Sequence, residues 1–172
     1  MPISGNLDPE LMKYFTDIPR YFAKHRQQRI EQGKTVFGDS IIQRLVVTHA
    51  SLDSKAEEPL KREGRLVCEI VVAEDMLNGG GSVHGGCSAF LIDLCSGLCL
   101  WILQPDVFTV SQSLNVVYHA PAALGETLRI VNTTLTVGSR TVSARTEIWS
   151  ATNHRLIASG VHIKMQPSET KL

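Results

Sequence analysis

Near the middle of the chain lies the almost wholly apolar stretch Gly86-Cys-Ser-Ala-Phe-Leu-Ile-Asp93-Leu-Cys-Ser-Gly-Leu-Cys-Leu-Trp-Ile-Leu-Gln104. The glycine-rich segment Asn78-Gly-Gly-Gly-Ser-Val-His84-Gly85 leads directly into it. Asp93 is the only ionised residue between His84 and Asp106. A carboxylate among Leu, Ile, Phe and Cys is costly to bury unless it is paired, and chains keep one mainly where chemistry or a specific partner needs it. The stretch therefore predicts a glycine-rich loop, a helix start and a buried acid/base group.

The composition is that of an ordinary globular protein. With 172 residues, of which 43% are hydrophobic and 20% charged, the chain is long enough for one well-formed domain. Its 17 basic and 17 acidic residues give no net charge, which argues against a nucleic-acid partner. The first eight residues show no secretory signal, so we expect an intracellular protein, cytoplasmic or mitochondrial.

The apolar stretch could span a membrane or form a buried helix, because its length is close to the roughly 20 residues that cross a bilayer. Asp93 near its centre would cost about 2.5–3.5 kcal/mol there, and no Lys or Arg flanks either end. A helix wrapped by a sheet is also apolar nearly all round. We therefore expect a buried helix and no integral membrane segment.

The cysteines predict packing and no metal site. Cys68, Cys87, Cys95 and Cys99 form no C-x-x-C pair, as expected for reduced, buried thiols. Cys95 and Cys99 share a helix face, but a zinc site needs two further ligands and no histidine pair has the required spacing. Cys87 lies near the expected helix start, a position that lowers the pKa of a thiol.

Residues 1–40 differ from the rest and predict an N-terminal helical extension, followed by a main domain over residues 41–172. Helix formers fill residues 8–32, with Pro19 as an interruption. Six basic residues lie between Lys13 and Lys34. A membrane-surface or partner-binding helix is one interpretation. A solvated helical arm packed on the domain is favoured, because the apolar residues form no wide stripe.

Strand patterns surround the apolar stretch. Residues 44–49 and 65–72 precede it, and in the second segment Leu66, Cys68, Ile70 and Val72 share one face. The polar residues 51–63 predict a loop. After the helix, which Pro105 ends, four strands are expected at residues 109–119, 127–137, 140–149 and 155–165. Short links require antiparallel pairing of neighbours, and one helix cannot cover both sheet faces, so the sheet should curl around it.

The pattern Asn78-x5-His84-Gly85-Gly86-x6-Asp93 resembles the hotdog-fold acyl-CoA thioesterases of the PaaI-like group. The later stretch Val110-Ser111-Gln-Ser-Leu-Asn115-Val-Val-Tyr118-His-Ala-Pro121-Ala is similar as well, and the likeness covers roughly residues 43–166. The resemblance implies an α+β hotdog fold, an antiparallel sheet wrapped around one long central helix. It also implies a homodimer, or a tetramer of dimers, whose active site lies at the subunit interface, with the loop of one subunit facing the helix of the other.

The resemblance implies a role for each candidate residue, with an acyl-CoA as substrate and no cofactor. Asp93 would act as general base or nucleophile, and the Gly85 amide would donate to the oxyanion. The remaining candidates are Asn78 for orienting water, His84 for holding the thioester or the loop, Ser111 for supporting the water and the aspartate, Gly86 for binding substrate, and Arg140 and Lys164 for the coenzyme A phosphates.

Two other functions remain open from the sequence. Hotdog hydratases and dehydratases pair an Asp with a His about four or five residues away on the same helix, whereas His84 and Asp93 are nine apart here. A non-catalytic acyl-CoA-binding or lipid-binding protein would need none of these residues. The set Asn78, His84, Gly85 and Asp93 therefore favours a thioesterase.

Overall fold

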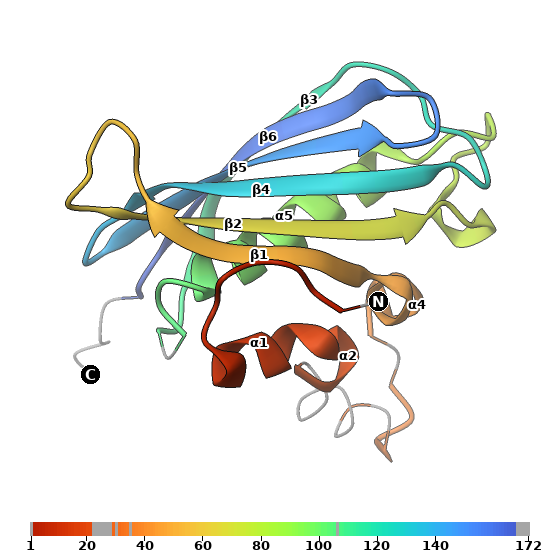
Figure 1. The fold of residues 1–172 in the computed structure, drawn as a ribbon. Coiled ribbons are helices and arrows are strands. Elements are labelled where there is room, and N and C mark those ends of the chain that lie inside the picture. Colours follow the sequence, from red (N-terminus) through yellow and green to blue (C-terminus); the bar gives the residue numbers. More distant parts are fainter. Residues whose placement is uncertain (1, 22–28, 30, 35, 106, 168–172) are drawn as a thin grey trace.

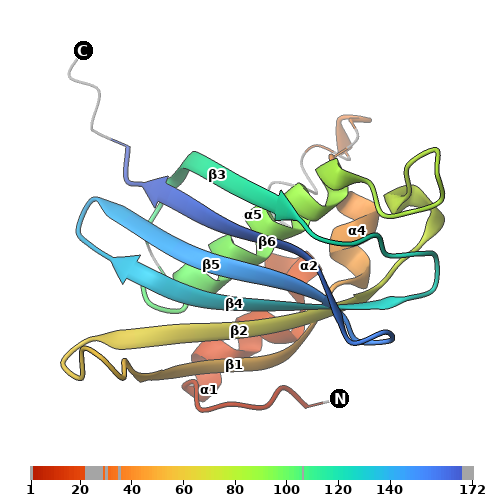
Figure 2. The ribbon, with the colours of Figure 1, turned by 90° about the horizontal axis from the view of Figure 1, so that it is seen from above.

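One antiparallel sheet and one long helix dominate the structure, a computed structural model that describes residues 2–21, 29, 31–34, 36–105 and 107–167. The strand order is β1-β2-β4-β5-β6-β3, and the described helices lie on one face of the sheet (Figures 1 and 2). The strands are β1 (Val46–Ser54), β2 (Arg62–Val71), β3 (Val110–Tyr118), β4 (Thr127–Val137), β5 (Thr141–Ser150) and β6 (Arg155–Met165).

The apolar stretch forms the central helix α5 (Gly85–Trp101), which packs against the sheet. Leu91, Ile92 and Cys95 of α5 are fully buried in the main core. The predicted inner face, residues 66, 68 and 70 of β2 with Val72 just after it, is buried as expected. The prediction of a buried helix wrapped by a sheet is therefore confirmed. Within the described part of the chain, no helix has the length and apolarity needed to cross a bilayer.

Two predictions about the strands are wrong. Residues 51–54 and 62–63 belong to the β1–β2 hairpin and are not loop. Their polar character is accommodated because the N-terminal segment runs along the free edge of β1, where Ala50 N–H donates to Ser4 O and Leu52 N–H donates to the Asn6 side chain. β3 pairs with β6 rather than with β4, although only a short link separates it from β4. That link crosses the end of the sheet, which leaves β3 at the edge (Figure 2).

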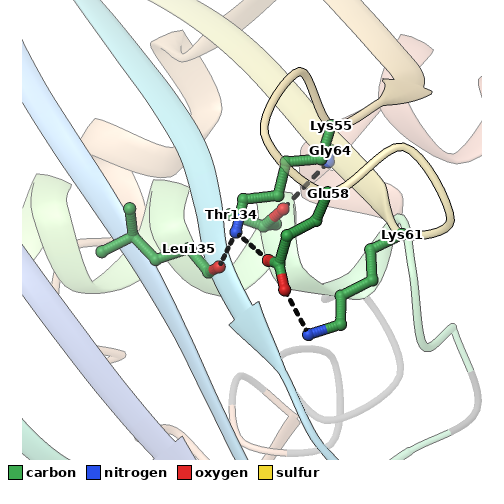
Figure 3. Close-up of polar contacts among 6 residues, drawn as sticks. All are labelled: Lys55, Glu58, Lys61, Gly64, Thr134 and Leu135. Atoms are coloured by element: carbon green, nitrogen blue, oxygen red, sulfur yellow. Dashed lines mark hydrogen bonds and ion pairs between the residues drawn. The ribbon is translucent and has the colours of Figure 1, made fainter.

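The hairpin loop of residues 55–61 is fastened to the sheet by charges and hydrogen bonds (Figure 3). Glu58 lies 2.7 Å from the amines of both Lys55 and Lys61. Lys55 also donates to the carbonyl of Leu135 on β4 at 3.2 Å. These contacts hold the pKa of Glu58 at about 2, chiefly through the hydrogen bond from Lys55.

The N-terminal segment contains α1 (Pro9–Thr16) and α2 (Ile18–Tyr21), followed by α4 (Asp39–Arg44), and η1 (Glu74–Met76) precedes α5. The helical interruption falls at Asp17, not at the predicted Pro19. Proline is tolerated in the first turn of a helix, so Pro19 fits inside α2. Phe15 and Ile18 are buried in the same core as α5. Part of the predicted basic helix, residues 22–28 and 30, lies outside the described residues.

All four cysteines are buried free thiols, as predicted. The expectation that the helix start lowers the pKa of Cys87 is wrong. Burial, with the nearby charge of Asp75, raises the pKa of this thiol to about 11. Among the described residues, no group of three or more His, Cys, Asp or Glu side chains could hold a metal ion.

Candidate active site

The start of α5 presents one free backbone amide. His84 caps the helix, and its Nδ1 accepts a hydrogen bond from Gly86 N–H at 2.8 Å. Gly85 occupies the first helical position, where an N–H has no partner inside the helix. Within the described residues no acceptor for it is found. Of the two candidate glycines, Gly85 therefore offers the available donor, and the N–H of Gly86 is already engaged by His84.

The loop before the helix is held by its own side chains. Asn78 Oδ1 accepts hydrogen bonds from Gly80 N–H at 2.8 Å and Ser82 N–H at 3.3 Å, which closes a local turn. Its amide nitrogen has no acceptor in the described part of the chain. On the other side, the Tyr118 hydroxyl donates to Gly85 O at 3.0 Å. Asn78, Gly85 and Tyr118 line one cavity of about 390 Å³.

Asp93 is more accessible than the sequence suggested. We expected a carboxylate buried among apolar side chains, but its side chain is 47% exposed in the single chain. Its position on α5 turns it toward β3 and β6. There it accepts a hydrogen bond from Ser111 Oγ at 3.2 Å and lies 3.3 Å from His162 Nε2. Solvent exposure and polar partners therefore reduce the cost of keeping this carboxylate charged, and it does not lie in a dry pocket.

Behind Asp93 lies a buried imidazole that the sequence analysis missed. His162 on β6 is fully buried, with Nδ1 2.7 Å from Ser96 Oγ and Nε2 3.0 Å from Ser111 Oγ. Burial lowers the pKa of His162, Asp93 opposes this, and Lys164 adds to the lowering. The imidazole is therefore in contact with Ser96 through Nδ1 and with Ser111 and Asp93 through Nε2. The sequence did carry a signal for this residue, because alternation along β6 places His162 on the same buried face as Ala158 and Gly160.

Lys164 belongs to the same cluster. Its amine donates to Ser111 Oγ at 3.3 Å, and both Lys164 and Asp93 line a groove of about 460 Å³. Arg140 is exposed in the turn between β4 and β5 and lines neither this groove nor the cavity at Gly85. The two candidates for phosphate binding are therefore in different surroundings.

The two halves of the site do not meet within one chain. Gly85 and Asp93 are eight positions apart on α5. At a rise of about 1.5 Å per residue, this is a distance of about 12 Å along the helix axis. The two residues line different cavities. An amide donor and a carboxylate this far apart cannot act on one carbonyl group.

The sheet wrapped on one long helix, with an amide donor at the helix start and a carboxylate at its middle, defines the class of hotdog-fold enzymes. The thioesterase superfamily matches residues 80–157 of this chain. Mouse acyl-coenzyme A thioesterase 13 is 34% identical over 100 residues, which cover 58% of this chain and 71% of that protein. The chain belongs to the thioesterase superfamily and is a thioester hydrolase.

Solved structures agree with this assignment. The crystal structure of zebrafish thioesterase superfamily member 2 superposes with a TM-score of 0.66 at 25% identity, covering 85% of this chain and 98% of that chain. The corresponding mouse structure gives a TM-score of 0.56 at 33% identity, covering 60% of this chain and 81% of that chain. The predicted hotdog fold is therefore confirmed.

Proposed function

We propose that this protein hydrolyses acyl-CoA thioesters at a site shared by two copies of the chain. Asp93 of one copy and the Gly85 amide of the other would face the same thioester carbonyl. The observation that carries this proposal is the separation of about 12 Å between these groups along a single α5. Each half is equipped for one part of the chemistry, and a two-fold axis would complete two sites at once.

The reaction requires an electron pair to reach the carbonyl carbon and the sulfur to leave. As general base, Asp93 takes a proton from water while the water oxygen bonds to that carbon. As nucleophile, Asp93 bonds to the carbon itself, the C–S bond breaks to give an anhydride, and water then cleaves that anhydride. In both routes the negative charge on the carbonyl oxygen is stabilised by Gly85 N–H and the N-terminal dipole of α5. The C–S bond then breaks, and the thiolate of coenzyme A takes up a proton.

The neighbouring residues support these roles. Ser111 and His162 fix the orientation of Asp93, and His84 fixes the loop by accepting from Gly86 N–H. The amide group of Asn78 would donate a hydrogen bond to the attacking water across the interface. Lys164, and Arg140 at the nearby hairpin turn, would supply positive charge for the phosphates of coenzyme A.

The sheet offers one edge for joining two copies. Ser4 and Asn6 occupy part of the edge of β1. β3 is the opposite edge strand, and its outer side has no backbone partner among the described residues. An unpaired strand edge is a template for a second chain. Antiparallel pairing of β3 with β3 would bring Ser111, which contacts Asp93, toward the Tyr118 end of β3 in the other copy, where Tyr118 contacts Gly85.

Mixing two inactive variants tests the shared site. Asp93→Ala removes the carboxylate, and Gly85→Pro removes the amide hydrogen at a first helical position, where proline is tolerated. The extended backbone of His84 suits a following proline, and Gly85→Ala is the matched control that keeps the N–H. Asp93→Ala and Gly85→Pro should each lose at least about 100-fold in kcat on an acyl-CoA panel read by thiol release.

Co-expressed or exchanged subunits should then recover about a quarter of wild-type activity, because half of the dimers are mixed and each holds one intact site. A site contained in one chain would recover nothing. Full activity of Asp93→Ala, or no thiol release by the wild type from any acyl-CoA, would overturn the proposed function.

The contact between Asp93 and His162 is the one observation that favours a second activity, since hotdog hydratases use an Asp and a His. His162 is fully buried behind Asp93 and cannot touch a substrate. We therefore expect no addition of water to an enoyl-CoA under conditions where the saturated ester is hydrolysed.

A further inference from the structure

The cavity beside the start of α5 is lined by a buried serine. Ser88 lies one turn into the helix, is 3% exposed and lines the cavity of about 390 Å³ together with Gly85 and Asn78. A serine inside a helix can donate to the carbonyl group one turn back. Ser88 Oγ makes no such bond, and it has no other hydrogen-bond partner within the residues that the structure describes. The hydroxyl group is therefore available to a ligand.

The accessible part of Ser88 Oγ faces this cavity. Among the described residues, every fully enclosed side-chain nitrogen or oxygen has a hydrogen-bond partner. Ser88 Oγ has none, so it must retain some accessible surface, and the cavity is the open space that Ser88 lines. Ser96, a buried serine two turns further along α5, differs because its Oγ lies 2.7 Å from His162 Nδ1.

Three hydrogen-bond donors line this one cavity and lack an acceptor in the described chain. They are the N–H of Gly85, the amide group of Asn78 and the hydroxyl of Ser88. A further hydroxyl, that of Tyr118, already donates to Gly85 O. The described lining contains no Asp or Glu. Such a cavity fits a group that accepts hydrogen bonds and gains negative charge, as a thioester carbonyl oxygen does during hydrolysis.

The spacing of Gly85 and Ser88 suits a single acceptor atom. The two residues are three positions apart on α5, a rise of about 4.5 Å along the axis. Helical residues at this spacing are neighbours on the surface, and side chains lean toward the N-terminus, so Ser88 Oγ extends toward Gly85. Two donors that each lie about 2.9 Å from one oxygen can be up to roughly 5.8 Å apart.

We propose that Ser88 is a second oxyanion donor, whose Oγ–H and the Gly85 N–H bind the same thioester carbonyl oxygen. This inference rests on the proposed function and places Ser88 in the half of the site that faces Asp93 of the other copy. The hydroxyl keeps its proton throughout, and no covalent bond to Ser88 forms or breaks. Its hydrogen bond strengthens as negative charge develops on the oxygen, which makes Ser88 a catalytic residue.

Steady-state kinetics on an acyl-CoA ester that the wild type hydrolyses tests this role. Ser88→Ala should lower kcat at least about tenfold with KM nearly unchanged, because the lost interaction is strongest in the transition state. Ser88→Thr keeps a hydroxyl group and should stay within about threefold of the wild-type kcat. Cys87→Ala is the matched control and should keep the wild-type kcat, since Cys87 is buried in the same turn but does not line the cavity.

Exchange of subunits tests which half of the site contains Ser88. Mixed with Asp93→Ala, Ser88→Ala should recover about a quarter of wild-type activity, because half of the dimers are mixed and each holds one intact site. Mixed with Gly85→Pro, it should recover nothing, because every site then lacks one of the two donors. Recovery with Gly85→Pro and not with Asp93→Ala would overturn the inference.

A wild-type kcat in Ser88→Ala, with Gly85→Pro inactive, would also overturn the inference and would leave the proposed function standing. An equal loss of kcat in Ser88→Ala and Ser88→Thr would do the same, because the retained hydroxyl would then have no effect. Absence of thiol release by the wild type from every acyl-CoA ester would remove the proposed function and this inference together.

Discussion

At the scale of single residues, the environment of Asp93 depends on one buried side chain. His162 Nε2 lies 3.3 Å from the carboxylate, while Nδ1 lies 2.7 Å from Ser96 Oγ. Glutamine places a donor near the position of Nε2, and asparagine places one near that of Nδ1. We expect His162→Asn to lower kcat about 10- to 100-fold with little change in KM, because Asp93 loses its polar neighbour at the Nε2 position. His162→Gln should retain more activity.

The two His162 variants separate an effect on the orientation of Asp93 from an effect on the stability of the fold. Both leave one side of a buried polar cluster unsatisfied, so thermal unfolding should report similar losses. Steady-state kinetics should nevertheless rank His162→Gln above His162→Asn. Equal kcat values for the two variants, or a change confined to KM, would contradict the positioning role of His162.

At the scale of elements, the ion pairs that hold the hairpin loop of residues 55–61 are sensitive to acid. Lys55 and Lys61 hold the pKa of Glu58 at about 2 in the folded state, against an ordinary value of 4.5. A carboxyl group whose pKa is lowered by folding stabilises the fold at any pH above its ordinary pKa. This contribution is lost as the pH falls from about 4.5 through 2. The ¹³C shift of the Glu58 carboxyl should therefore titrate near 2.

The cause of that low pKa is tested by removing one amine at a time. Lys55→Met should raise the midpoint more than Lys61→Met, because the hydrogen bond from Lys55 is the larger contribution. Lys55 also binds Leu135 O, so amide exchange in the loop should quicken only in this variant. A midpoint near 4.5 in the wild type would show that the ion pairs do not persist in solution.

The elements themselves were largely predictable from local pattern. α5, β4 and β6 follow from apolar runs, alternation and turn residues, and their positions were correct. The extent of β1 was not predictable in this way, because its polar end is stabilised by Asn6, a residue far away in the chain. The pairing of β3 with β6 was also missed, since a short link does not reveal which strand lies beside which.

The site was predictable in part for the same physical reason. Asp93 and Gly85 stand out within one local segment, and the chain resembles a family at these positions. The approach of His162 to Asp93 and Ser96 depends on how β6 lies across α5. The alternation along β6 marks His162 as buried, but local sequence carries no signal for its contact with Asp93.

At the scale of the whole molecule, the proposed site, divided between two copies, would make activity depend on assembly. Specific activity should fall when the enzyme is diluted below the dissociation constant of the dimer, and it should follow the dimer fraction measured by analytical ultracentrifugation. Within the described residues, β3 is the sheet edge without a backbone partner on its outer side, while Ser4 and Asn6 partly cover β1. The dimer should therefore respond to changes on β3 and not to changes on β1.

Val117 and Val46 provide a matched pair for this test. Both are exposed valines on edge strands, at 48% on β3 and 53% on β1. Val117→Lys places like charges near each other across a β3–β3 contact and should raise the dissociation constant about tenfold or more, with an equal shift in the dilution curve of activity. Val46→Lys adds the same charge at the other edge and should change neither. A fully active monomer of Val117→Lys would contradict the shared site, because one chain alone holds Gly85 and Asp93 about 12 Å apart.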